Sequence, residues 1–150
     1  MALPRNILVP LDLGDHATRV LEYAVALAAT LDAKVHVLHA VNWPVLGAEI
    51  PVSVSDKAMD EIVAKHQREL DQLAATYARG APVGSVEVKV GDPRALIPQI
   101  AEQRGVDLIV MGTHGRSGIA RLLLGSVAET VARAAPCPVL LVRSGTVVAP

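Results

Sequence analysis

The chain has 150 residues, of which 14 are basic and 15 acidic, so its formal net charge is −1. This length suits one domain that buries a core of its own. Balanced charges and an aromatic content of only 2% argue against a nucleic-acid platform. No apolar run reaches the roughly 18 residues of a membrane span, so we expect neither nucleic acid nor a membrane as a partner.

The first residues and the cysteine content bear on the compartment. The chain enters an apolar run at Asn6, which leaves no room for a signal peptide before it. Cys137 is the single cysteine, so no disulfide can form within the chain. We therefore expect a cytoplasmic protein.

Short apolar runs alternate with helical patterns along the chain. The predicted strands are residues 6–11, 34–41, 85–90, 107–111 and 139–142, and the predicted helices are about 15–31, 56–79, one beginning at 92–93, and 126–135. This order predicts one α/β domain over residues 1–150, with a parallel sheet, helices on both faces and right-handed crossovers. Residues 144–150 are expected to form a frayed tail.

Specific residues are expected to begin these helices. Asp15 is the expected cap of the first helix, and Asp92 followed by Pro93 is typical of a helix start. Ser126 and Glu129 have the S-x-x-E spacing of a capping box. Pro98 is expected to kink or shorten the helix that contains it, because proline removes a backbone hydrogen bond.

The histidines of the second strand resemble a metal pair. His36 and His39 are expected on one face of that strand. No third ligand accompanies them, so structural histidines are the favoured interpretation. His66 is expected to pack or to lie on the surface of the second long helix.

The segment from Gly112 to Ser126 joins a strand end, a glycine-rich loop and a helix start. Glycines let the backbone approach a ligand, and the free N–H groups of a helix start attract anions. The G-x4-G-K-[ST] pattern of a P-loop and the G-x-G-x-x-G pattern of a Rossmann fingerprint are both absent. We expect this segment to meet two other strand ends, Pro10–Asp12 and His39–Val41, around a nucleotide.

Four motifs resemble those of the universal stress protein family. The stretch Gly112–Ser126 matches G-x2-G-x9-G-[ST], the motif of the family's nucleotide-binding subgroup. The phrases V-P-L-D at Val9–Asp12, D-L-I-V-M-G at Asp107–Gly112 and C-P-V-L-L-V at Cys137–Val142 are similar to family phrases. The resemblance covers about residues 5–143.

The resemblance implies a Rossmann-like five-stranded parallel sheet in the order 3-2-1-4-5, similar to that of adenine nucleotide alpha hydrolases. It also implies a homodimer joined through the last strand, about Val139–Val142. The implied ligand is ATP, or else ADP or AMP, bound at the ends of strands one and four. Because the chain offers few basic groups for a triphosphate, we expect Mg²⁺ or Mn²⁺ to accompany it, and no metal ligand is assigned.

Site residues are carried over by position from the family's motifs. The Val41 backbone would meet the adenine edge, while Pro10 and Asp12 would line the base and ribose. Gly112 and Gly115 would let the loop close over ribose and phosphates. The N–H groups of Gly125, Ser126 and Val127 would meet the phosphates. In the loop, Arg116 is expected to balance phosphate charge, and His114 to contact ribose or phosphate.

The expected function is regulatory. ATP would order the loop and bias which protein partner, as yet unidentified, docks on the surface. No residue is assigned a catalytic role, because no second group is placed to orient His114 as a base. Two alternatives stay open: a slow ATPase or phosphotransferase using Asp12, His114 and Arg116, and a dimerisation module without a working site.

Overall fold

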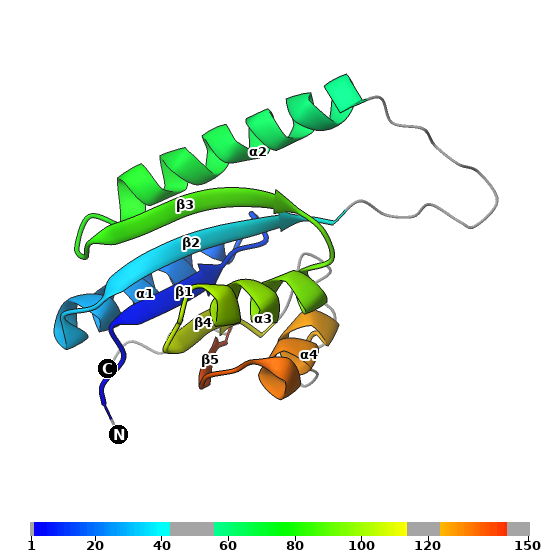
Figure 1. Cartoon of the computed structure of the whole chain (residues 1–150). Coiled ribbons are helices and arrows are strands. Elements are labelled where there is room, and N and C mark those ends of the chain that lie inside the picture. The colour runs from blue at the N-terminus through cyan, green and yellow to red at the C-terminus, as the bar shows by residue number, and fades with distance from the viewer. Residues whose placement is uncertain (1, 43–55, 114–123, 144–150) are drawn as a thin grey trace.

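The structure, a computed structural model, describes residues 2–42, 56–113 and 124–143 (Figure 1). In chain order its elements are β1 Asn6–Pro10, α1 Ala17–Leu31, β2 Lys34–Val41, α2 Asp56–Tyr77, β3 Val83–Val90, α3 Pro93–Gln103, β4 Leu108–Gly112, α4 Ser126–Ala134 and β5 Val139–Val142. This alternation confirms the predicted α/β class. None of these helices is both long enough and apolar enough to cross a membrane, within the ranges described. The expected tail, 144–150, lies outside them.

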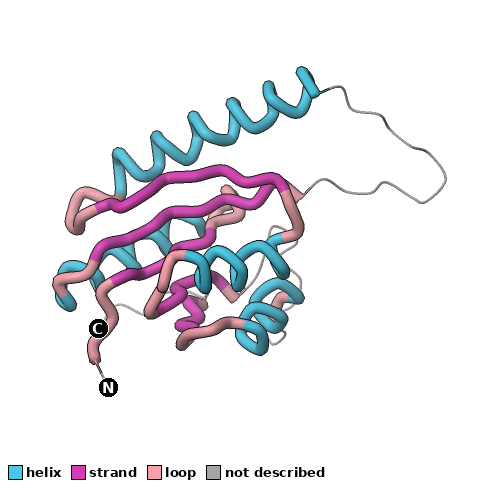
Figure 2. The backbone as a smooth tube through the Cα atoms, in the orientation of Figure 1, coloured by secondary structure: helices cyan, strands magenta, loops and turns pink. Residues whose placement is uncertain are grey.

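In the described ranges, five strands pair in parallel in the order β3-β2-β1-β4-β5. The expected order 3-2-1-4-5 is therefore confirmed, with β3 and β5 at the two edges. Figure 2 shows helices lying on both faces of the sheet. Helices α1 and α2 cover one face, and α3 and α4 cover the other.

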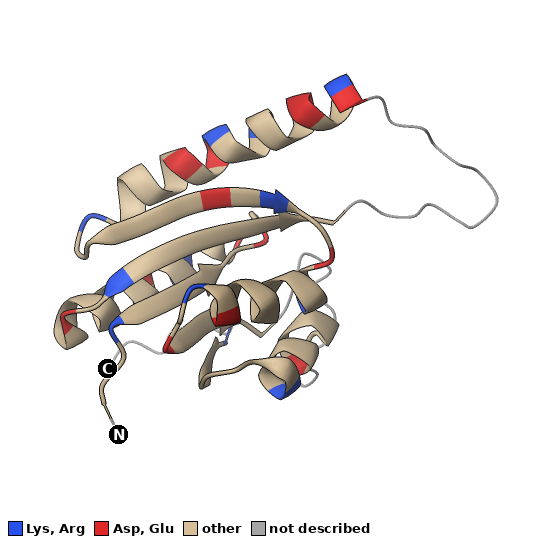
Figure 3. Ribbon diagram, viewed as in Figure 1, with Lys and Arg blue, Asp and Glu red and all other residues tan. Residues whose placement is uncertain are grey.

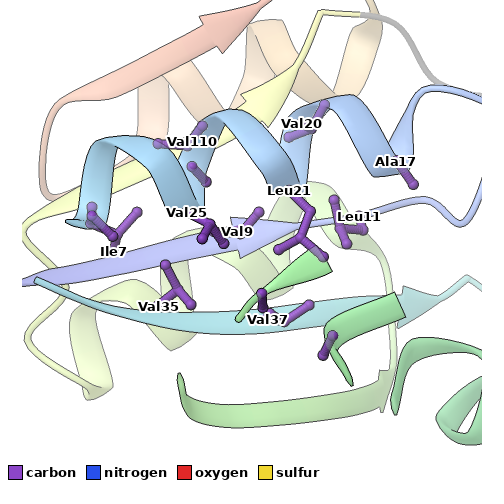
Figure 4. Packing of buried hydrophobic residues seen from close by; sticks show 14 of the residues in the cluster. Ile7, Val9, Leu11, Ala17, Val20, Leu21, Val25, Val35, Val37 and Val110 are labelled. Atoms are coloured by element: carbon purple, nitrogen blue, oxygen red, sulfur yellow. The ribbon is translucent and has the colours of Figure 1, made fainter. Parts of the chain in front are cut away.

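The alternation of side chains along each strand divides the core between the two faces. Ile7 and Val9 of β1 pack with α1 and α2, whereas Leu8, between them, packs with α3 and α4. Figure 4 shows the first group gathered against α1, with Val35, Val37 and Val110 contributed by neighbouring strands. Full burial of each such aliphatic side chain stabilises the fold by about 1.5–3 kcal/mol.

Charges are mixed over the surface. Figure 3 shows Lys and Arg interspersed with Asp and Glu on α2, β3 and α3, without a stripe of one sign on the face in view. This distribution agrees with the near balance of 14 basic and 15 acidic residues.

One of the three predicted helix starts is confirmed. Asp92 caps α3, because its Oδ1 accepts the Arg94 N–H at 3.0 Å, and Pro93 occupies the first turn. The helix runs on through Pro98 to Gln103, so of the two expected effects of Pro98 the shortening was wrong, and the kink stays a prediction. One missing backbone bond is not enough to end a helix whose Ile97, Ile100 and Ala101 are buried.

The other two predicted caps were wrong. Helix α1 begins after His16 and has no side-chain cap, because the Gly14 carbonyl of the preceding turn accepts the Ala17 N–H at 3.1 Å in place of an Asp15 cap. Helix α4 has Gly125 at its N-cap, which places Ser126 one position inside the helix. Glu129 is then one position too far along for a capping box, which needs the glutamate three residues after the N-cap, and it pairs with Arg133 at 3.0 Å.

The two histidines of β2 lie on opposite faces of the sheet. His36 contacts Ser85 beside α3, whereas His39 contacts His66 of α2. The expectation of a shared face was wrong, because side chains three residues apart in a strand point in opposite directions.

Candidate functional site

A cavity of about 480 Å³ opens at the C-terminal ends of the central strands. This volume lies in the range of small-molecule sites, roughly 300–1,000 Å³. Strands β1 and β4 are neighbours there, but the chain leaves β1 for α1 on one face and β4 for α4 on the other. The cavity therefore lies at the point where strand order reverses, which is where open parallel sheets bind ligands.

Most of the predicted site residues meet around this cavity. Its lining includes Pro10, Asp12, Val41, Gly112, Gly125, Ser126 and Val127. Three expected contacts, His114, Gly115 and Arg116, lie outside the described residues. The three strand ends that were expected to converge do so.

The turn after β1 fixes the position of Asp12. Its Oδ1 accepts the Gly14 N–H at 2.9 Å, and the Leu11 N–H donates to the Leu38 carbonyl at 2.8 Å. Leu13, between Asp12 and Gly14, has a φ of 60°, a left-handed conformation that costs a leucine roughly 1–2 kcal/mol. Backbone held in such a conformation is concentrated at functional sites.

The start of α4 presents backbone donors to the cavity. The Gly125 N–H is engaged by the Thr113 carbonyl at 2.7 Å, and the first helical bond joins the Glu129 N–H to the Gly125 carbonyl at 2.9 Å. The N–H groups of residues 126–128 precede that bond and have no acceptor within the helix. Residues 126–128 all line the cavity, and no side chain caps the helix. Such a helix start can hold an anion.

The register of β2 decides which backbone groups face the cavity. The Val41 carbonyl accepts the Gly91 N–H at 3.0 Å, so the Val41 backbone points toward β3. The Leu38 carbonyl points the other way, toward Leu11 after β1. Backbone groups alternate in direction along a strand, so Ala40 also points toward the β1 side, beyond the end of that strand. This geometry favours Ala40, not Val41, as the backbone partner of a ligand.

A pair of histidines forms another part of the wall. Nδ1 of His39 lies 2.7 Å from the Leu11 carbonyl oxygen, and Nε2 lies 3.2 Å from Nδ1 of His66. His39 is only 5% exposed, and both rings line the cavity. The sequence predicted only that His66 would pack or lie on the surface of its helix, so it did not indicate this pair.

His36 belongs to a separate cluster away from the cavity. Its Nδ1 lies 2.9 Å from Oγ of Ser85, which accepts a hydrogen bond from Arg104 at 2.7 Å. Arg104 also pairs with Glu87. Burial lowers the pKa of His36, as do the nearby charges of Arg104 and Lys34. The cluster ties the end of α3 to the sheet.

Cys137 is also remote from the cavity. It packs against the core formed by α3 and α4. Burial raises the pKa of its thiol, and the nearby Asp107 raises it further. A reactive cysteine needs the opposite shift, so the interpretation as a small core residue is favoured.

The fold and the strand-end cavity define an open α/β protein of the kind that binds small ligands at a topological switch point. The chain belongs to the universal stress protein family, whose sequence pattern matches residues 4–143. It is 34% identical over 144 residues to Universal stress protein MJ0531 of Methanocaldococcus jannaschii, covering 94% of this chain and 83% of the relative. It is 36% identical over 141 residues to Universal stress protein A homolog 2 of Coxiella burnetii, covering 93% and 94%.

Solved structures of the family are similar. The universal stress protein UspA from Lactobacillus plantarum superposes with a TM-score of 0.74 and 28% identity, covering 95% of this chain and all of that one. A universal stress protein solved in complex with cAMP superposes with a TM-score of 0.69 and 26% identity, covering 97% of this chain and 100% of that one.

Proposed function

We propose that this protein is a cytoplasmic stress-response regulator that binds ATP in the strand-end cavity. The observation that carries the proposal is the meeting of seven predicted residues around one cavity, with the amides of the α4 start in its wall. The neighbour solved with cAMP supports an adenine nucleotide as the ligand class. ADP and AMP are the alternative ligands.

The cavity offers a different partner to each part of the nucleotide. The Ala40 backbone would meet the polar edge of adenine. The N–H groups of Ser126 and Val127 would hold the phosphates, and the motif residues His114, Gly115 and Arg116 are expected to close over them. This division follows from the direction of the β2 backbone and from the positive end of α4.

A divalent cation fits the same cavity. Asp12 is the one carboxylate among the described lining residues. Mg²⁺ commonly takes one or two carboxylates together with substrate phosphates, and Mn²⁺ also prefers oxygen ligands. Asp12 would hold the cation against the triphosphate and offset part of its charge.

Binding without rapid turnover is the favoured mode. Phosphoryl transfer needs a positioned nucleophile together with cationic stabilisation. The described lining residues include no lysine or arginine, and their histidines at positions 39 and 66 are engaged with each other. Nucleotide would therefore bias the conformation that a protein partner recognises.

The edge strand β5 is the proposed homodimer contact. Its four residues, Val139–Val142, are all apolar and each is only half-buried. An apolar strand at a sheet edge is a template for pairing with a second chain. Replacing Leu141 with Glu should shift the sedimentation coefficient to that of a monomer, and an unchanged value would exclude this contact.

Calorimetric titration with ATP and Mg²⁺ tests the nucleotide proposal. We expect saturable binding of one nucleotide per chain and, over hours, phosphate release at the buffer rate. No binding at millimolar ATP, ADP or AMP would refute the proposal. Phosphate release that is abolished by Asp12→Ala would favour the ATPase alternative.

A further inference from the structure

The hydrogen bonds of the His39–His66 pair have a fixed direction. A carbonyl oxygen can only accept, so Nδ1 of His39 carries the hydrogen that bonds to Leu11, at 2.7 Å. In a neutral ring Nε2 of His39 is then an acceptor, and Nδ1 of His66 must donate to it across 3.2 Å. Nε2 of His66 is then unprotonated and keeps its lone pair, and it has no hydrogen bond to any described residue.

This arrangement accepts one proton without losing a contact. A proton on Nε2 of His66 leaves both existing hydrogen bonds intact and strengthens the one to His39, because the donor is now charged. A second proton, on Nε2 of His39, would set two N–H groups against each other across 3.2 Å. The pair can therefore take up only one proton beyond those of the two neutral rings, and the His66 ring carries this extra proton.

The charges around the cavity favour this proton when an anion is bound. The described lining has one carboxylate, Asp12, and its only cationisable side chains are His16, His39 and His66. His16 is exposed at the start of α1, where the helix dipole disfavours a positive charge.

The other elements near His66 add little charge to the cavity. On α2 itself, Lys65 and Glu69 are exposed. Strand β3 packs apolar Val86 and Val88 against the core shared with α2. At the start of α3, Asp92 and Arg94 pair with each other at 2.9 Å. Of the described groups, the His66 ring is thus the one placed to supply positive charge inside the cavity.

We propose that binding of a nucleotide phosphate in this cavity is coupled to uptake of one proton from solvent by Nε2 of His66. The inference rests on the proposed nucleotide site and adds its regulation. Because binding then takes up a proton, nucleotide affinity rises as the pH falls. The protein thereby reports nucleotide and proton concentration together.

Calorimetry in buffers of different ionisation enthalpy measures the coupling directly. The observed binding enthalpy of Mg·ATP, plotted against buffer ionisation enthalpy near pH 7, has a slope equal to the number of protons taken up. The test variant is His66→Gln, whose amide can still donate to His39 but cannot gain a proton. The control is His36→Gln, which removes a histidine on the opposite face. Ionisation of the nucleotide itself is common to all three proteins and cancels in the comparison.

We expect wild type and His36→Gln to take up a measurable fraction of one proton more than His66→Gln. Between pH 8 and pH 6 the wild-type affinity should rise about three- to tenfold more than that of His66→Gln. Nucleotide binding with equal proton uptake in all three proteins would overturn this inference and leave the proposed function standing. Absence of nucleotide binding would overturn both.

A measurement on the wild type avoids dependence on the variant. The imidazole Cε1–H resonance of His66, followed by NMR near pH 7, should move toward its protonated position when Mg·ATP is added. A resonance that stays at its neutral position in the bound state would contradict proton uptake by this ring.

Discussion

Replacing Ser126 with Pro would remove the backbone N–H that we propose as a phosphate donor, while preserving the helix. Ser126 is the first residue of α4, and proline is favoured at that position. Gly125 before it has φ −61° and ψ 151°, the extended conformation that a residue preceding proline prefers. The Ser126 N–H has no acceptor within the helix, so no helical hydrogen bond is lost.

The expected effect on ATP binding is large. A hydrogen bond to a charged group contributes about 1.5–3 kcal/mol. Losing the Ser126 N–H should therefore raise the Kd of ATP roughly tenfold to a hundredfold. The Ser126→Ala variant keeps the N–H and loses only the hydroxyl, which contributes about 0.5–1.5 kcal/mol if it bonds at all.

Calorimetric titration of the three proteins with Mg·ATP measures both effects. Thermal unfolding serves as the control, since the proline variant should unfold at or slightly above the wild-type temperature. If Ser126→Pro unfolds as the wild type does and binds ATP with unchanged affinity, the α4 start does not hold the phosphates. An equal loss in Ser126→Ala and Ser126→Pro would show that the hydroxyl, which both variants lack, is the donor, and not the amide.

Three further predictions concern stability. In Gly84→Ala the new Cβ would clash with the His36 ring, which should cost about 1–3 kcal/mol in urea unfolding. His36→Ala in the same chain should recover most of this loss, and an equal cost in both backgrounds would contradict the clash. Asp92→Ala removes the bond to the Arg94 N–H and should cost about 1 kcal/mol, with Asp92→Ser close to wild type; a fully stable Ala variant would show that the cap is dispensable. Hydrogen bonds from backbone N–H groups lower the pKa of Asp107 in the folded state. The stability that Asp107 contributes is therefore fully present above the pKa of the unfolded state and is lost as the pH falls through the pKa of the folded state. The stability difference between wild type and Asp107→Asn should thus shrink below about pH 4, and a constant difference would be inconsistent with this linkage.

The strands could be predicted closely from the sequence because each is a short apolar run between turn residues. Strands β2 and β5 begin and end where predicted, at Lys34–Val41 and Val139–Val142. Their order came from the family resemblance, since alternation alone fixes a parallel sheet but not which strand lies beside which.

Helix starts were harder to predict, because the capping group need not be the nearest polar side chain. Asp15 and Ser126 are both good capping residues by type. The turn geometry instead gave these roles to the Gly14 carbonyl and to Gly125, one residue before the expected cap. A backbone carbonyl or a neighbouring residue can take the place of the expected cap, and the sequence does not show which group does so.

The cavity could be predicted as a place but not in all its chemistry. Motif spacing located the ends of β1, β2 and β4 correctly. The preference for Ala40 over Val41 depends on register, because one residue reverses the direction of the backbone groups. The His39–His66 contact joins residues 27 apart across two elements and has no local signal.

The proposed nucleotide site is tested most directly by amide NMR of uniformly ¹⁵N-labelled protein titrated with Mg·ATP. We predict the largest shifts at the N–H groups of Ala40 and of residues 126–128, which line the cavity. The amide resonances at the start of β3, from Val83 to Glu87, should not shift, because these residues lie at the N-terminal end of the strand, away from the cavity at the C-terminal strand ends. Saturable shifts at β3 with none at Ala40 or the α4 start would contradict the central claim that the strand-end cavity holds the nucleotide.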